Sequence, residues 1–518
     1  MALLPIMMES SLLPMSNIFI SIFLFLLSLL LFSQFFMRRP TSKLKLPPSP
    51  PKLPIIGNFH QVGTLLHRSL RALSHKYGPL MLLHFGNVPT LVVSSADMIR
   101  EIANNHDVIF CNRPTSTAAR IFFYGCADIG FAPYGEYWRQ GRKVCVLELL
   151  SLKRVLSFEF VREEETAGFI HKLRDASLRG NKVNLSEMLI ATLNNIVLRC
   201  ILGNKFEEDD GKSKFGELIK RVMIQFTSFS FGDFFPALSW MDHLTGLISS
   251  LKATFGEIDP FLEQVLKDHE AGRGSSSDHS DNKDFVDILF QLKKDGMLQM
   301  DLTRDNLKAI LLDMFMAGSD TTSSTVEWAM AELLRNESMM KKAQDEVRKV
   351  IGKKSRIEVN DMNQMDYLKC VIKETLRLHP PAALIFREAS ERVNLGGYDI
   401  PPKTRVLINS LAIQTDPNLW DRPEEFVPER FENNQIDLKG LDSHYIPFGF
   451  GRRGCPGLKF GVFTVEYIMA SLLYWFDWKL PGGNNIAPTP KDLDMEDVFG
   501  LSAHKKNPLI VIPILYSP

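Results

Sequence analysis

The sequence predicts a mainly α-helical fold with a smaller β component, preceded by a single N-terminal helix that could cross a membrane. The stretch Ile18–Met37 contains no charged residue and is long enough to span a hydrocarbon core as a helix. From about residue 95 onward the pattern is mainly helical. Short apolar runs before residue 95, and a proline-rich stretch from Pro401 to Pro428, indicate strands and irregular segments instead.

The composition allows one large domain or a few smaller ones in this chain of 518 residues. Basic and acidic residues balance at 60 each, so no overall field attracts nucleic acid. The six cysteines include no Cys-x-x-Cys pair. This pattern argues against a disulfide framework and against a zinc site, and it fits a reducing compartment.

The N-terminal apolar run predicts a retained membrane anchor over residues 18–37, with residues 1–17 as a short lumenal end. The first basic residues, Arg38 and Arg39, follow the run, and positive flanks stay cytoplasmic. A cleaved signal peptide is the alternative, but it would need a basic region before the run and a small-residue cleavage site after it. Residues 38–58 are basic and proline-rich and predict a stiff hinge. We expect a cytosolic body over residues 59–518.

Two strands are predicted early in the body, Leu80–Phe85 and Thr90–Ser94, on either side of a Gly86-Asn87 turn. The polar segment 271–283 is rich in glycine and serine, so it predicts a surface loop. We interpret it as a connection within one domain, because residues that carry chemistry lie on both sides of it.

A long helix is predicted from Thr303 to about Asn336, since this stretch contains no proline. Gly318 in its middle lowers helix stability, and the threonines after Asp320 can hydrogen-bond to carbonyl groups of their own helix. The segment Ala317–Thr322 therefore predicts either a packing glycine beside a back-bonded threonine, or a local distortion that makes room for a ligand.

A single cysteine lies in the glycine-rich segment Pro447–Gly457, and an apolar run that can form a helix follows from Leu458 to Leu473. Glycines permit positive φ and close approach to a flat cofactor, and a helix N-terminus stabilises a thiolate. Cys455 is therefore predicted to bind haem iron through its thiolate, which favours O–O cleavage. The alternative is a buried structural cysteine.

The cysteine segment fills every specified position of the pattern Phe-x-x-Gly-x-Arg-x-Cys-x-Gly. On this motif the chain resembles the cytochrome P450 family of haem-thiolate monooxygenases. The Pro-Pro-Ser-Pro-Pro hinge, Tyr137–Gln140 and Asp320–Ser324 make it most similar to the plant microsomal A-type group, and the resemblance covers nearly the whole chain. The matched positions are Phe448, Gly451, Arg453, Cys455 and Gly457.

The resemblance implies the cytochrome P450 fold and a haem b cofactor with Cys455 as its axial ligand. It assigns oxygen activation to Thr321 and proton relay to Asp320, which is general acid work by a positioned network. It also implies a buried structural triad of Glu374, Arg377 and Arg430.

Further residues are implied to contact the haem and the substrate. Phe386 departs from the proline that many relatives carry before the propionate-binding arginine. The implied cofactor contacts are Trp138, Arg142, Arg387, Phe448 and Arg453. The implied substrate pocket is apolar and contains Phe122, Phe123, Met314, Ala317, Ala383, Ile385 and Leu501. Asp313 lies one turn before Ala317, and we expect it to be a structural acid whose hydrogen bonds are satisfied. The alternative is a role in binding a cationic amine.

The implied activity is oxidation of a lipophilic plant specialised metabolite by an enzyme of the endoplasmic reticulum membrane that faces the cytosol. Terpenoids or alkaloids are favoured as substrates, and coumarins or phenylpropanoids remain possible. Electrons would come from NADPH through a separate flavoprotein reductase, which Arg139 and Lys143 could contact. Two alternatives are a peroxide-rearranging haem-thiolate enzyme that needs no reductase, and a haem-binding protein without turnover.

Overall fold

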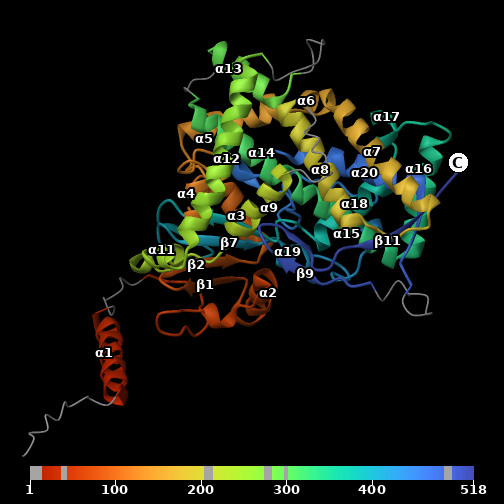
Figure 1. Ribbon diagram of the computed structural model, residues 1–518. Helices are drawn as coiled ribbons and strands as arrows, with labels where there is room; N and C mark the ends of the chain where they lie inside the picture. The colour runs from red at the N-terminus through yellow and green to blue at the C-terminus, as the bar shows by residue number, and fades with distance from the viewer. Residues whose placement is uncertain are drawn as a thin grey trace, which may run out of the picture. The chain divides into compact units, whose positions relative to one another are not determined.

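The computed structural model describes residues 15–36, 44–203, 214–272, 283–296, 302–482 and 493–517 (Figure 1). The chain divides into two compact units, Met1–Leu46 and Pro47–Pro518. This boundary lies inside the hinge predicted over residues 38–58. The first 14 residues of the predicted lumenal end and residues 273–282 of the predicted surface loop lie outside the described residues.

The first unit contains helix α1, Met15–Phe36, where the sequence predicts the anchor. Its described side chains from Phe19 to Leu29 are exposed. Among the described residues, the helix long and apolar enough to cross a membrane is α8, Leu185–Leu202, but 61% of that window is buried in the second unit. The segment Phe19–Leu30 counts as a shorter apolar helix.

The β structure of the second unit is confined to small sheets, the largest having the strand order β1-β2-β7-β4. Its strands are β1 (Leu80–Phe85), β2 (Val88–Val93), β7 (Arg405–Asn409) and β4 (Leu384–Glu388), and only the β2–β7 pair is parallel. The two predicted early strands are present, and Gly86 turns between them with φ of 60°. The smaller sheets are β3 (Val183–Asn184) with β11 (Ile510–Leu515) and β8 (Phe476–Lys479), β5 (Val393–Leu395) with β6 (Tyr398–Ile400), and β9 (Asp497–Phe499) with β10 (Ala503–Lys505).

Helices make up most of the second unit, which confirms the predicted fold class. Those before residue 273 are α2 (Leu66–Tyr77), α3 (Ala96–Asn105), α4 (Thr117–Phe122), α5 (Glu136–Val144), α6 (Leu152–Ser157), α7 (Glu159–Leu178), α8, α9 (Lys214–Phe226), α10 (Phe231–Phe234), α11 (Met241–Leu244) and α12 (Leu247–Glu270). Those after it are α13 (Phe285–Lys294), α14 (Arg304–Gly318), α15 (Asp320–Arg335), α16 (Glu337–Ile351), α17 (Val359–Met362), α18 (Asp366–Leu378), α19 (Ser410–Gln414) and α20 (Leu458–Trp475). Single turns lie at Phe59–Gln61, Cys145–Leu149, Pro236–Leu238, Pro428–Phe431 and Gly451–Arg453.

The predicted helix over residues 303–336 is divided at Ser319 into α14 and α15. Thr303 begins α14 with a capping box, in which its side chain and that of Asn306 each accept a hydrogen bond from the other's backbone. At the break, the hydroxyl of Thr321 donates to the carbonyl oxygen of Ala317 at 2.7 Å, and that of Thr322 donates to Gly318 at 2.7 Å. These side-chain bonds occupy carbonyl groups that the helix would otherwise use.

The main hydrophobic core is formed where α8, α14, α15, α18 and α20 pack together. In Figure 1 these helices lie on one side of the second unit, and strands β1, β2 and β7 lie on the other. The core residues Val326, Leu333 and Leu472 are fully buried. This packing fixes the break in α14–α15 and the start of α20, which bound the candidate site.

Candidate active site

A cavity of about 340 Å³ lies between the α14–α15 break, the cysteine loop and strand β4. Its wall is mostly apolar, with a few ionisable side chains. The lining includes Ile129, Leu150, Met314, Ala317, Gly318, Thr321, Thr325, Ile385, Phe448 and Phe460, together with Arg113, Arg142, Asp313, Arg453 and Cys455. Such a wall suits a large, mainly apolar ligand with a few polar or anionic groups.

Cys455 is held in a tight loop that ends where α20 begins. Its backbone N–H donates to the carbonyl oxygen of Phe448 at 2.8 Å, and Gly449 and Gly451 adopt φ of 72° and 61°. A Cβ atom on Gly451 would lie 2.3 Å from Oδ1 of Asp107, so only glycine fits there. The loop therefore requires its glycines for both conformation and space.

The Cys455 side chain is exposed toward the cavity, whereas the other five cysteines, all within the described residues, are buried. Burial by surrounding protein raises the pKa of the Cys455 thiol, because the wall keeps bulk water away. The backbone N–H groups of Gly457 and Leu458 and the charges of Arg142 and Arg113 lower this pKa in opposition. The start of α20 and two guanidinium groups thus favour the thiolate, but in this structure burial outweighs them.

Three guanidinium groups lie in the cavity wall. Arg142 donates to the carbonyl oxygen of Gly454. Arg453 donates from Nε to Cys111 at 2.7 Å and from Nη1 to Ile129 at 3.0 Å. Burial and the charge of Arg113 lower the pKa of Arg453 to about 9, while Cys111 and Asp128 oppose the shift.

Arg113 is a functional candidate that the sequence reasoning missed. Its Nη1 donates to the carbonyl oxygen of Phe386 at 3.3 Å, and its buried Nε has no hydrogen-bond partner among the described residues. Burial lowers its pKa. An unpaired guanidinium N–H at a cavity wall calls for an anionic acceptor, and the two propionates of haem meet that need. The only sequence signal is an arginine before Pro114, which is too common to identify such a role.

Two residues expected at the cofactor do not line the cavity. Trp138 donates from Nε1 to the carbonyl oxygen of Ile129 at 3.0 Å and packs against the Arg453 guanidinium. Arg387 donates from Nη1 to Phe386 at 3.1 Å and from Nη2 to Phe450 at 3.5 Å. Both side chains contact backbone next to the cavity wall instead.

The proton-relay candidates point in different directions. The Thr321 side chain lines the cavity, while the Asp320 carboxylate accepts a hydrogen bond from the Ser502 hydroxyl and does not line it. Burial raises the pKa of Asp320, and the nearby His504 opposes the shift. A Cβ atom on Gly318 would lie 3.0 Å from Val197, so this glycine permits close packing against α8.

The expected substrate residues divide into two groups. Met314, Ala317 and Ile385 line the cavity. The others do not: Phe122, Phe123 and Ala383 are buried in the protein core, and Leu501 is 39% exposed at the surface. Phe123 stacks on Phe131 with ring centroids 5.7 Å apart, so its ring packs within the core.

Glu374, Arg377 and Arg430 are in contact behind the cysteine loop. Arg377 makes a two-point contact with Glu374, from Nε at 2.7 Å and from Nη2 at 2.8 Å, and both side chains are completely buried. Arg430 donates from Nε to the same carboxylate at 2.9 Å. Arg377 also donates to the carbonyl oxygen atoms of Gln414, Pro423 and Glu425, which ties the segment before the cysteine loop to α18.

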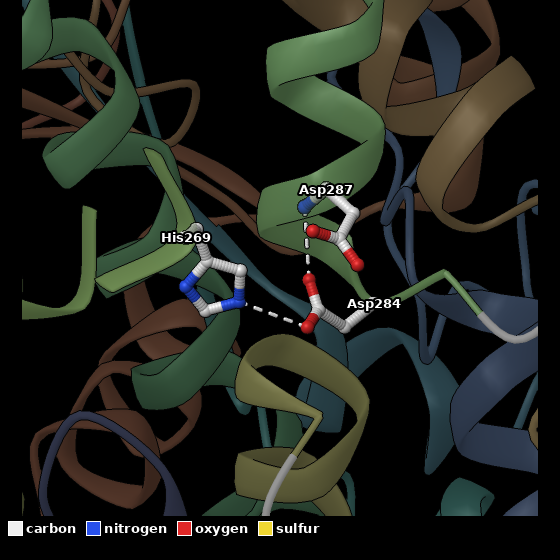
Figure 2. Close-up of side chains that lie close together, drawn as sticks. All are labelled: His269, Asp284 and Asp287. Carbon is white, nitrogen blue, oxygen red and sulfur yellow. Dashed lines mark hydrogen bonds and ion pairs between the residues drawn. The ribbon is translucent and has the colours of Figure 1, made fainter. Parts of the chain in front are cut away.

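One further group of titratable side chains lies between α12 and α13, where His269, Asp284 and Asp287 point toward one another (Figure 2). His269 contacts the Val265 carbonyl oxygen through Nδ1 at 2.8 Å and Asp284 through Nε2 at 2.9 Å. Asp284 also accepts from the backbone of Asp287 and so caps α13. These contacts account for the cluster as an ion pair and a helix cap, and we assign no metal to it.

Comparison with known proteins identifies the family of this chain. The cytochrome P450 family model matches residues 47–508. Phenylacetaldehyde oxime monooxygenase CYP71AN24 of Prunus mume is 53% identical, covering 97% of this chain and 96% of that protein. Desmethylyatein synthase of Sinopodophyllum hexandrum is 49% identical over 92% and 95% of the two chains, and costunolide synthase of Cichorium intybus is 45% identical over 94% and 96%.

Among solved structures, a zebrafish cytochrome P450 determined with progesterone superposes with a TM-score of 0.74 at 24% identity, covering 86% of this chain and 99% of that one. This likeness confirms the fold predicted from the sequence. The chain therefore belongs to the cytochrome P450 family, as a haem-thiolate monooxygenase of the CYP71 type found in plant specialised metabolism.

Proposed function

We propose that the protein is a membrane-anchored monooxygenase that oxidises a lipophilic plant specialised metabolite, with terpenoids or alkaloids favoured and coumarins or phenylpropanoids next. The observation that carries this proposal is the exposed Cys455 thiol in the wall of a mainly apolar cavity, with the hydroxyl-bearing Thr321 in the same wall. The relatives named for costunolide and desmethylyatein support a lipophilic substrate.

The residues present fit haem. Cys455 would bind the iron, and Arg113, Arg142 and Arg453 would pair with the propionates, because these guanidinium groups line the cavity and Arg113 retains an unpaired N–H. Trp138 and Arg387 would hold the backbone around the propionate site. Haem with a thiolate ligand supplies the activation of dioxygen and the insertion of one oxygen atom.

The role of the chain's own residues is to orient the substrate and to deliver protons. Thr321 can hold a proton at its Oγ1, which is bonded to the Ala317 carbonyl oxygen at 2.7 Å. Asp320, bonded to Ser502 on the other side of the helix, would bring protons from the C-terminal segment. The apolar residues Met314, Ala317 and Ile385 exclude water and contact the substrate.

A separate reductase would dock beside the cysteine loop. The exposed side chains of Arg139 and Lys143 on α5, Arg452 in the loop and Lys459 on α20 form a basic surface there. Arg139 pairs with Glu136, and Arg452 pairs with Asp107 at 3.3 Å. Lys143 and Lys459 are therefore the stronger candidates for an acidic partner that brings electrons from NADPH.

The proposed location is the endoplasmic reticulum membrane, with the second unit on the cytosolic side. The exposed apolar side chains of α1 support an anchor. Within the second unit, Ile55 and Ile56 after the proline-rich segment, and Trp240 and Leu244 near α11, are also exposed and support contact with lipid.

Replacement of Cys455 by serine tests the proposal. We expect the ferrous carbonyl complex of the variant to lose the red-shifted Soret band of thiolate ligation, and oxidation of NADPH in the presence of reductase to stop. The matched control is Cys370→Ser, at a buried thiol in α18, which should retain both. An unchanged spectrum in Cys455→Ser would refute the assignment of the ligand.

The same preparations separate the two alternatives. A peroxide-rearranging enzyme would show the thiolate spectrum and turn over a hydroperoxide without NADPH. A haem-binding protein without turnover would show the thiolate spectrum and consume neither a hydroperoxide nor NADPH.

A further inference from the structure

Two aspartates meet at the cavity wall, Asp313 from α14 and Asp128 from the loop between α4 and α5. Asp128 is fully buried, and Asp313 is partly exposed and lines the cavity. A Cβ atom on Gly130 would lie 3.1 Å from Oδ2 of Asp128 and 3.1 Å from Oδ1 of Asp313. The two carboxyl groups thus lie beside one glycine and close to each other.

Backbone N–H groups occupy one oxygen of each carboxyl group. Oδ2 of Asp313 accepts from Ile129 at 2.7 Å and from Gly130 at 3.2 Å, and Oδ2 of Asp128 accepts from Phe131 at 2.8 Å. Oδ1 of Asp128 is buried and finds no N–H or basic donor among the described residues. A hydroxyl on Asp313 would supply the missing donor.

The groups that face the pair from neighbouring elements form no ion pair with either carboxyl group among the described residues, although the charges of Arg113 and Arg453 favour ionisation. Arg113 and Arg453 are the nearby cations, and their guanidinium groups donate to backbone carbonyl oxygen atoms. The other titratable neighbours are Tyr137, whose pKa burial raises, and Cys145, whose pKa burial raises to about 12, so both are neutral. Two carboxyl groups this close in a wall shielded from bulk water, without an ion pair among the described residues, do not both ionise.

We propose that Asp128 and Asp313 share one proton, with Asp313 as the neutral acid, so that the cavity selects uncharged substrates over cationic ones. This inference rests on the proposed function and narrows its substrate class: a neutral terpenoid or phenolic fits, and a protonated amine does not. In agreement, burial and the neighbouring Asp128 raise the pKa of Asp313 well above its ordinary value, and burial raises that of Asp128 to about 6.

Infrared spectroscopy of the holoenzyme at neutral pH tests the shared proton directly. We expect the C=O stretching band of one protonated carboxyl group to disappear in Asp313→Asn and also in Asp128→Asn, where the asparagine amide donates to an ionised Asp313. The variant with both substitutions should lose no more of the C=O band than either single variant does. The control Asp97→Asn, at an exposed carboxylate, should leave the band unchanged. A band unaffected by Asp313→Asn would overturn the proposal.

The wild-type protein supplies the same test if a variant fails to fold. Isotopic labelling of aspartate carboxyl carbons shifts the aspartate bands away from those of glutamate. Absence of any protonated aspartate band at neutral pH would also overturn the proposal. Neither measurement depends on turnover, so a negative result leaves the monooxygenase assignment intact, and failure of the Cys455→Ser experiment leaves the shared proton intact.

Calorimetric binding to the holoenzyme tests substrate selection with phenylpropyltrimethylammonium and its neutral isostere, in which carbon replaces nitrogen. The wild type should prefer the isostere. Asp313→Asn, which keeps every hydrogen bond and adds no charge, should show the same preference. Asp128→Asn should shift the preference toward the cation by about tenfold, because Asp313 then ionises. Equal or tighter binding of the cation by the wild type would contradict the proposal.

Discussion

Thr321 illustrates how one hydroxyl can serve both the helix and the chemistry. Its Oγ1 donates to Ala317 at 2.7 Å, and its side chain lines the cavity together with Cys455. The bond keeps the hydroxyl in place, and the break at Ser319 leaves it accessible from the cavity. The role that we propose for this atom is to release its proton toward a ligand and to recover one from its surroundings.

Replacement of Thr321 by alanine should uncouple reduction from oxidation. We expect NADPH consumption in the presence of reductase to continue, while product formed per NADPH falls by about tenfold and hydrogen peroxide accounts for the difference. Thr321→Ser is the control, because it retains the hydroxyl. Product and peroxide measured against NADPH decide the question, and unchanged coupling in the alanine variant would contradict the role of Thr321.

Single residues differ in how far the sequence can predict them. Cys455 could be predicted because its loop needs a fixed spacing of glycines, an arginine and a phenylalanine. Arg113 could not, since its place in the cavity wall depends on how the segment after α3 packs beside β4, and an isolated arginine carries no signal of that packing. Trp138 and Arg387 lie next to the cavity but donate to backbone groups. No local sequence pattern predicts these hydrogen bonds.

Helices and strands follow the sequence where a local pattern is strong. The strand pair β1–β2 ends at a glycine that adopts positive φ, and α14 starts at a capping box. The sequence could not locate the division of α14 and α15 at Ser319, because several residues of the segment could have absorbed the distortion. Gly318 packs closely on Val197 beside the division, a tertiary contact that the local sequence does not reveal.

Among the contacts of single helices and strands, the buried ion pair of Arg377 with Glu374 on α18 should have the largest effect on stability. We expect Arg377→Ala to lower the free energy of unfolding by about 3–5 kcal/mol, because it leaves the buried Glu374 carboxylate without its two-point partner. Arg100→Ala removes an arginine at the same i,i+3 spacing from an exposed pair with Asp97, and should cost less than about 1 kcal/mol. Urea unfolding measures both, and equal losses would argue against a dominant role for burial.

The stability that the contact between α2 and β9 contributes should depend on pH. Burial raises the pKa of Asp497, but the hydrogen bond from His67 and the charge of Arg68 outweigh it and lower this pKa to about 2, from an ordinary value of 3.8. The stabilisation is therefore complete above 3.8 and is lost as the pH falls toward 2.

Asp497→Asn should remove this contribution. At neutral pH we expect the variant to be less stable than the wild type by about 2 kcal/mol. The difference between the two proteins should shrink as the pH falls below 3.8. Denaturant unfolding across that range measures it, and a difference that does not vary with pH would show that the pair contributes no acid dependence.

At the scale of the whole molecule, the division at Leu46 and Pro47 separates the apolar N-terminal unit from the body. We expect a chain that begins at Leu46 to keep its fold and its haem-thiolate spectrum, because the contacts that form the cavity lie within the second unit. Such a chain should float with phospholipid vesicles to a smaller extent than the full-length protein. Flotation of both proteins with phospholipid vesicles provides the comparison, and equal flotation would place the main lipid contact elsewhere.

Helix α8 has a consequence for biosynthesis. It is as long and apolar as a bilayer-crossing segment, yet in the finished molecule it packs against α7, α14 and α15. Translation produces α8 well before α14 and α15, so the nascent polypeptide exposes an apolar segment while two of these three packing partners are not yet made. We therefore expect the nascent chain to need chaperones at the ribosome, above all when it is synthesised beside a membrane.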